Sequence, residues 1–157
     1  MSVKPGDSAP DFNLPSSEKE MISLNEQRGH NVVLLFFPAA FTSTCTIELC
    51  TVRDDLAYYN NLDARVFGIS VDMPYSLAKF KEEQSLTFSL LSDFNKDVIR
   101  AYGTIYEDWA FGMKGVAKRS SFVIDKDGII RHAEVLEDAN ELPDFEAIKN
   151  ALEKLGS

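Results

Sequence analysis

Residues 31–45 read NVVLLFFPAAFTSTC, and this segment predicts the centre of the fold. Asn31 to Phe37 is an unbroken apolar run, rich in β-branched, aliphatic and aromatic residues, which is typical of a strand buried on both faces of an α/β sheet. Pro38 ends the run, because a proline has no N–H to offer to a strand ladder. We therefore expect a central strand here, followed by a short turn and a helix that begins close to Cys45.

The segments around this strand alternate between helix and strand patterns. We expect helices at 42–60, 74–83, 97–102 and 143–155, strands at 65–71, 120–124 and 129–135, and a peripheral N-terminal hairpin formed by 12–14 and 21–24. The turn sequence DKDG at 125–128 predicts that the two strands beside it pair antiparallel. This order resembles a thioredoxin-like α/β fold with an N-terminal β-hairpin extension and a central mixed sheet flanked by helices. A length of 157 residues predicts a single domain, 1–157.

The composition argues against several classes of partner. A formal net charge of −9 with scattered basic residues disfavours nucleic acid, whose phosphates attract clustered Lys and Arg. No apolar run approaches the roughly 20 residues of a membrane-spanning helix, and positions 1–15 lack the apolar core of a secretory signal, so we expect a cytoplasmic protein without membrane contact. Two cysteines are too few for a disulfide scaffold or a cysteine-based zinc site, and we expect no metal and no cofactor.

Cys45 stands where a cysteine can become a nucleophile. At a helix start the backbone amides of Thr44 and Cys45 lack intrahelical partners, and they would stabilise a thiolate. Thr42 can hold its hydroxyl near the sulfur, to donate to the thiolate or to a substrate oxygen, and Pro38 would shield the rim of the pocket from water. Each residue also has an ordinary structural interpretation: Cys45 as a small buried hydrophobe and Thr42 as a helix N-cap.

Residues Pro38-Ala-Ala-Phe-Thr42-Ser-Thr-Cys45 match the active-site pattern Pro-x-x-x-Thr/Ser-x-x-Cys of peroxiredoxins, and the chain resembles that family over essentially its whole length. Arg119-Ser-Ser-Phe-Val-Ile-Asp125 is similar to the family segment whose arginine contacts the cysteine sulfur and the peroxide. The resemblance implies that Arg119 activates Cys45 and that Glu48 orients Arg119. Taken alone, Arg119 could be a surface charge at a strand end, and Glu48 a first-turn acid that favours the helix dipole.

Cys50 lies five positions after Cys45, a spacing that resembles the PrxQ branch, also called bacterioferritin comigratory protein, in which the second cysteine resolves the first. Thr44 stands where that branch commonly has glycine, and PAAFT at 38–42 resembles the AhpE-like branch. In a regular helix five residues separate the two Cα atoms by about 9 Å on nearly opposite faces. A disulfide needs Cα atoms within about 7 Å, so resolution by Cys50 requires the first turns of the helix to unwind.

The resemblance implies a thioredoxin-dependent peroxidase that reduces hydrogen peroxide and organic hydroperoxides. Cys45 would become a sulfenic acid, Cys50 would resolve it as an intrachain disulfide, and a thioredoxin-like reductant would restore both thiols. Three alternatives stay open: a one-cysteine peroxiredoxin resolved by an external thiol, a redox-sensing binding protein, and a thiol-disulfide oxidoreductase. The last is disfavoured, because the sequence contains no Cys-x-x-Cys.

The sequence leaves two oligomeric states open, a monomer and a homodimer. PrxQ members are often monomers and AhpE-like members dimers, and the resemblance covers both branches. Four aromatic residues could form an exposed patch near the active-site loop that suits a symmetric dimer: Phe41, Tyr75, Trp109 and Phe111. Ordinary core packing of these side chains is the alternative interpretation.

Overall fold

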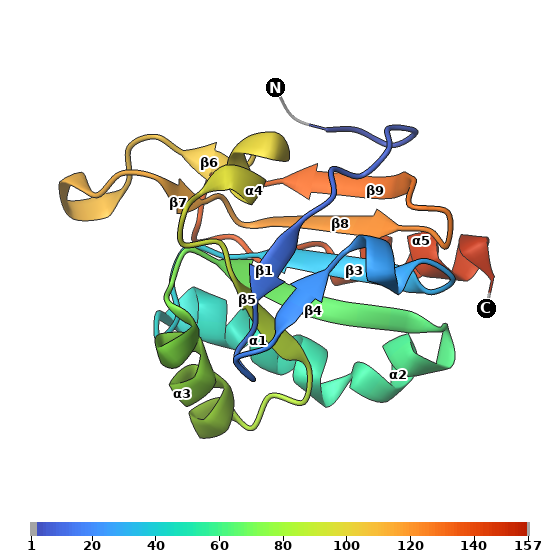
Figure 1. Cartoon of the computed structure of the whole chain (residues 1–157), viewed down its shortest axis with the longest axis horizontal. Coiled ribbons are helices and arrows are strands. Elements are labelled where there is room, and N and C mark those ends of the chain that lie inside the picture. Colours follow the sequence, from blue (N-terminus) through green and yellow to red (C-terminus); the bar gives the residue numbers. More distant parts are fainter. Residues whose placement is uncertain (1–2, 157) are drawn as a thin grey trace.

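A computed structural model describes residues 3–156 and has a five-stranded mixed sheet at its centre (Figure 1). The strands lie in the order β5 (Ser89–Ser92), β4 (Ala64–Ser70), β3 (Asn31–Phe36), β8 (Ser120–Ile124) and β9 (Ile130–Val135). The middle strand, β3, pairs parallel with β4 and antiparallel with β8. The predicted central strand and mixed sheet are therefore confirmed. The ends of the predicted domain, 1–2 and 157, lie outside the described residues.

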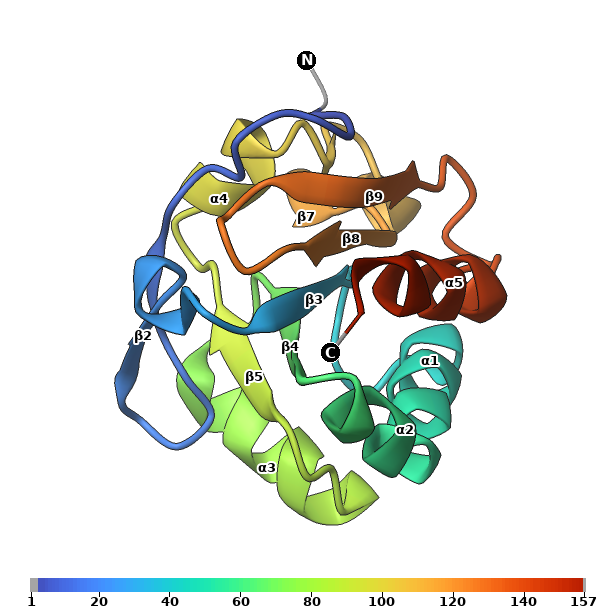
Figure 2. The same ribbon diagram turned by 90° about the vertical axis from the view of Figure 1, so that its right-hand side faces the viewer.

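Helices cover one face of this sheet, and the N-terminal hairpin and one short helix cover the other (Figure 2). The first face carries α1 (Ser43–Asp54), α2 (Leu56–Asn61), α3 (Pro74–Gln84) and α5 (Phe145–Leu155). The second face carries β1 (Asn13–Pro15), β2 (Met21–Ser23) and α4 (Asp97–Ala101). Smaller elements complete the chain: η1 (Asn25–Gln27), β6 (Ile105–Tyr106), η2 (Ala110–Gly112) and β7 (Val116–Ala117). Within residues 3–156, no helix is long and apolar enough to cross a bilayer.

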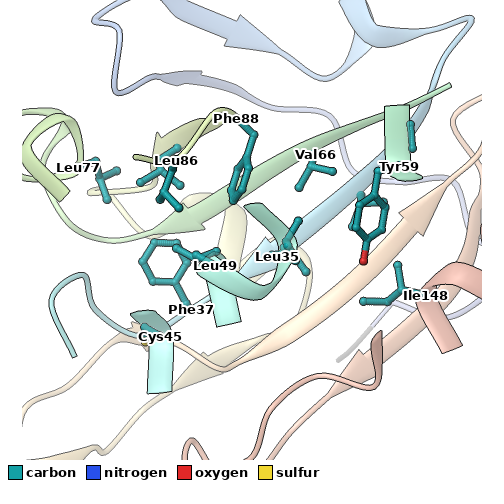
Figure 3. Close-up of a cluster of buried hydrophobic side chains, with 14 of the residues drawn as sticks. Leu35, Phe37, Cys45, Leu49, Tyr59, Val66, Leu77, Leu86, Phe88 and Ile148 are labelled. Carbon is teal, nitrogen blue, oxygen red and sulfur yellow. The ribbon is translucent and has the colours of Figure 1, made fainter. Parts of the chain in front are cut away.

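Strand β3 is apolar throughout because both of its faces are buried. Val33, Leu35 and the following Phe37 point into the cluster under α1, α2, α3 and α5, whereas Val32, Leu34 and Phe36 point into the cluster on the hairpin side. Cys45 belongs to the first cluster, and Figure 3 shows it at one end, beside Phe37 and Leu49. The helix face of the sheet therefore carries the reactive-site candidates.

Two expectations differ from the structure. The helix expected at 42–60 is wrong as a single element, because it breaks at Asp55, where φ is −116° and ψ is 13°. The Asp55 carboxylate pairs there with Lys149 of α5, a contact distant in sequence that local helix signals do not contain. Strand β5 had no counterpart in the sequence prediction, because four residues are too few to show a periodicity. The hairpin at 12–14 and 21–24 is confirmed to within one residue.

Candidate active site

The carboxyl end of β3 delivers the chain to α1 through a short loop, residues 38–42. Pro38 is buried at its start, and Thr42 is the N-cap residue of α1 with an extended backbone. Phe41 between them has a φ of 69°, in the left-handed region that non-glycine residues seldom occupy, and its ring contacts Phe80 of α3 with 5.1 Å between the centroids. The loop is thus a strained connection held by its neighbours.

Thr42 does not use its hydroxyl as the sequence predicts. Its Oγ1 donates a hydrogen bond of 2.8 Å to the carbonyl oxygen of Ala39, and the described structure has no side-chain cap at this end of α1. Because the hydroxyl proton is taken, the lone pairs of Oγ1 are what Thr42 offers to a ligand. The amides of Ser43, Thr44 and Cys45 belong to the first turn of α1, where N–H groups lack intrahelical partners.

Arg119 binds the Cys45 sulfur, Glu48 and the Ala139 carbonyl oxygen through its guanidinium. It precedes β8 directly, is only 2% exposed, and donates from Nη2 to the Cys45 sulfur over 3.2 Å. Its Nη1 donates to Glu48 Oε1 over 2.6 Å, and Nε and Nη2 both reach the carbonyl oxygen of Ala139, at 3.0 and 2.9 Å. A planar guanidinium has five donors in a fixed geometry and makes all four of these bonds, whereas a lysine ammonium has only three donors.

Burial and charge act against each other in this cluster. Glu48 and Cys45 are both fully buried. Loss of solvent raises the pKa of Glu48 to about 7, although its charge interaction and hydrogen bond with Arg119 oppose the rise. Burial alone would lower the pKa of Arg119, but Glu48 and Cys45 outweigh that effect and hold it above its ordinary value. Arg119 therefore stays a cation, and its guanidinium lies beside the Cys45 sulfur.

A hollow opens where α1 begins. Its lining residues are Thr42, Ser43, Thr44, Trp109, Ala110, Arg119, Ala139 and Asn140. Three hydroxyl-bearing residues, the start of a helix and a guanidinium therefore surround a space wide enough for a small polar molecule. Sequence reasoning missed Ala139 and Asn140. Ala139 acts through its carbonyl oxygen, which every residue type carries, so no sequence signal could have identified it.

Cys50 lies away from this cluster. It is half-buried on the same helix as Cys45, with its sulfur 3.5 Å from Gln84 Oε1 at the end of α3, and both cysteines are free thiols. Because α1 is continuous from Ser43 to Asp54, the two Cα atoms are about 9 Å apart by helix geometry, beyond disulfide reach. The structure thus brings Cys45, Arg119 and Glu48 together and leaves Cys50 apart.

The four aromatic residues named from the sequence divide into two groups. Phe41, Tyr75 and Phe111 are 53%, 67% and 99% exposed, whereas Trp109 is half-buried and lines the hollow. Core packing is therefore the wrong interpretation for the first three. Phe111 is also held in the left-handed region, with a φ of 59°, on the loop that carries Trp109.

The chain is similar to known proteins over most of its length. Residues 5–133 match the AhpC/TSA family, and a putative peroxiredoxin of Mycobacterium tuberculosis is 44% identical over 130 residues, which cover 82% of each chain. The chain belongs to the peroxiredoxins. Peroxiredoxin Bcp of Escherichia coli is 38% identical to it over 132 residues, covering 83% of this chain and 84% of its own. The crystal structure of peroxidoxin BcpB from M. tuberculosis matches this peroxiredoxin with a TM-score of 0.87 and 30% identity over 99% of both chains.

These similarities confirm two predictions from the sequence. The resemblance to peroxiredoxins of the bacterioferritin comigratory branch is correct, and so is the thioredoxin-like fold. Peroxiredoxins are thiol-dependent peroxidases, so this chain is an oxidoreductase that acts on peroxide with electrons from thiols.

Proposed function

We propose that Cys45 is the peroxidatic cysteine of this peroxiredoxin, and that Arg119, Thr42, Pro38 and the amides of Thr44 and Cys45 form its peroxide site. One observation carries the proposal: the 3.2 Å contact between Arg119 Nη2 and the Cys45 sulfur inside a buried cluster. A cation fixed beside a thiol favours the thiolate, the form that attacks peroxides. The hollow beside it supplies space for the substrate.

The first step transfers one oxygen atom to sulfur. The Cys45 thiolate attacks the terminal oxygen of the hydroperoxide, the S–O bond forms, and the O–O bond breaks. The remaining oxygen leaves as hydroxide or alkoxide and takes a proton to become water or an alcohol, while Cys45 becomes a sulfenic acid. Arg119 and the helix-start amides stabilise the negative charge that develops on the leaving oxygen. Thr42 Oγ1, whose proton is engaged with Ala39, accepts the O–H of the peroxide.

The second step forms an intrachain disulfide. The first turns of α1 unwind, and the Cys50 thiolate attacks the Cys45 sulfur. The S–S bond forms, the S–O bond breaks, and the sulfenic hydroxyl leaves as hydroxide, which takes a proton to become water. A thioredoxin-like dithiol then reduces the disulfide by exchange. Two free thiols on one helix, with Cys50 only half-buried, support this role for Cys50. Resolution by an external thiol, as in a one-cysteine peroxiredoxin, is the alternative.

Further parts of the proposal concern the protein as a whole. We infer hydrogen peroxide and organic hydroperoxides as substrates, and a cytoplasmic location, since a cycle through free thiols needs a reducing compartment. We also infer a single domain over 1–157, because one sheet carries both core clusters. The oligomeric state is a monomer or a homodimer. The exposure of Phe41, Tyr75 and Phe111 favours the dimer, which sedimentation of the wild type and of Phe111→Ser would test.

The test is peroxide consumption with thioredoxin and its reductase as electron source. We expect turnover by the wild type and none by Cys45→Ser. Cys50→Ser should consume one equivalent of peroxide and then stop. Full turnover by Cys50→Ser with thioredoxin would remove Cys50 from the cycle and establish the one-cysteine alternative. Disulfide formation without peroxide turnover, with any thiol reductant, would instead favour a redox sensor.

A further inference from the structure

Asp72 lies two residues beyond the end of β4, next to the loop that follows β3. The two strands are parallel neighbours, and their ladder continues past β3 through a hydrogen bond from Phe37 N to Ile69 O. The chain segments after both strands therefore leave the sheet at the same edge. This position brings Asp72 to the loop at 38–42, which carries no titratable side chain of its own.

One carboxylate oxygen of Asp72 holds this loop directly. Its Oδ2 accepts a hydrogen bond of 2.8 Å from the backbone N–H of Ala40, midway between Pro38 and Thr42. Ala40 is only 8% exposed, so its N–H would lack a ready replacement in water. A bond from a backbone amide to a carboxylate is charge-assisted and stronger than a neutral one.

The loop needs an external support of this kind. Phe41 stands in the left-handed region with a φ of 69°, and Pro38 has no N–H with which to bond. Left-handed backbone at a non-glycine residue is costly and persists only where its surroundings enforce it. Asp72 on one side of Phe41, and the bond from Thr42 Oγ1 to Ala39 O on the other, provide that enforcement.

Asp72 is itself fixed by the sheet. Ser70 Oγ donates to the same Oδ2 over 2.7 Å and accepts from Asp72 N–H over 3.2 Å, while Ser92 Oγ donates to the Asp72 carbonyl over 2.6 Å. Ser70 and Ser92 are buried and lie in β4 and β5. Asp72 therefore connects the loop that precedes Cys45 with two strands, β4 and β5.

We propose that Asp72 is a positioning residue that keeps the loop at 38–42, and with it the first turn of α1, in the arrangement that attacks peroxide. This proposal rests on the function proposed above for Cys45. It predicts opposite effects on the two chemical steps, which a general loss of stability would not produce. Loosening the loop slows oxidation of Cys45, which needs an ordered site, but speeds disulfide formation with Cys50, which needs the first turns to unwind.

The test compares Asp72→Ala with Asp72→Asn in single-turnover experiments. An asparagine keeps a side-chain oxygen that can accept from Ala40 and Ser70, whereas alanine removes it. Trp109, the only tryptophan, lines the hollow and reports both steps by its fluorescence. Asp72→Ala should slow Cys45 oxidation by about tenfold or more, the effect expected from losing a charge-assisted hydrogen bond, and should speed the disulfide step. Asp72→Asn should stay within about threefold of wild type for both rates.

Asp127→Ala is the matched control, since it removes an exposed aspartate from the turn that follows the end of β8 opposite to Arg119. We expect its oxidation rate to be close to that of wild type. Amide hydrogen exchange provides a readout that needs no peroxide: Ala40 and the first turn of α1 should exchange faster in Asp72→Ala than in Asp72→Asn. Equal losses in the two Asp72 variants, slowing of both chemical steps by Asp72→Ala, or unchanged exchange would overturn the proposal. Failure of the wild type to react with peroxide would refute the function of Cys45 while the exchange result still tests the loop.

Discussion

At the scale of single residues, Arg119 is the centre of the site, because its donors reach the Cys45 sulfur, Glu48 and the Ala139 carbonyl together. Arg119→Lys keeps the charge but can satisfy only part of this set. We expect the second-order rate constant with hydrogen peroxide to fall by about a hundredfold, measured by stopped-flow fluorescence. Lys118→Met, at the neighbouring position, is the control that should keep its rate, because the Lys118 ammonium pairs with the exposed Glu137 and lies over the Tyr106 ring. An Arg119→Lys rate within about threefold of wild type would contradict this role.

Glu48 should change how the free energy of unfolding depends on pH. Its pKa is about 7 in the folded protein against an ordinary value of 4.5, so between these values the folded state holds a proton that the unfolded chain has lost. The free energy of unfolding should therefore fall as the pH rises through this window, by roughly 1–3 kcal/mol relative to Glu48→Gln. Urea titrations of both proteins at several pH values measure the difference. Parallel curves would contradict the buried, proton-binding state of Glu48.

The residues of the site differ in how far a sequence can predict them. Side-chain chemistry and sequence spacing are enough to recognise four of them: Pro38, Thr42, Cys45 and Arg119. The direction of the Thr42 hydrogen bond is not, since it depends on where the Ala39 carbonyl points. The contact between Asp72 and Ala40 joins residues 32 positions apart, so only the folded sheet brings them together.

At the scale of elements, α1 has two incompatible duties. In the proposed cycle it must begin in an ordered turn to place Cys45 beside Arg119, and it must unwind to let Cys50 reach Cys45. We expect the disulfide form to show faster amide hydrogen exchange at 43–50 than the reduced form, with α3 and α5 unchanged. Cys50→Ser treated with one equivalent of peroxide is the control and should keep α1 protected. Full protection of 43–50 in the disulfide form would contradict the unwinding.

Elements with strong local signals were predictable, and others were not. Helix α5 follows its amphipathic pattern, and Asp144 caps it by accepting from Ala147 N–H over 3.0 Å. The break between α1 and α2 falls at Asp55, whose carboxylate pairs with Lys149, far along the chain. Strand β5 carries only four residues, and its place beside β4 is what makes it a strand.

At the scale of the whole molecule, the sheet separates the core cluster on the hairpin side from the face that carries Cys45. Phe122 lies on the hairpin face and packs edge-on against Phe36, with 5.6 Å between the ring centroids, whereas Cys45 lies on the helix face. Phe122→Leu should lower the free energy of unfolding by about 1 kcal/mol or more. The folded variant should nevertheless oxidise at the wild-type rate. Urea unfolding and stopped-flow oxidation test the two halves, and a large loss of rate in the folded variant would contradict the separation.

The alternation of strand and helix patterns was enough to predict a mixed sheet around β3 flanked by helices, although not its edge strand β5, because a buried strand such as β3 leaves few ways to arrange its neighbours. The sequence left exposure of Tyr75 and Phe111 open against core packing, since aromatic residues often fill a core, and the structure shows both exposed.

The most direct test of the account is the mass of the protein after one equivalent of hydrogen peroxide. We predict a product about 2 Da lighter than the reduced protein, with the loss confined to the segment that contains Cys45 and Cys50, as an intrachain disulfide requires. Cys50→Ser should instead gain about 16 Da, the mass of one oxygen, at Cys45. A wild-type protein that keeps its reduced mass, or that gains oxygen at Cys45 without forming the disulfide, would contradict the proposed cycle.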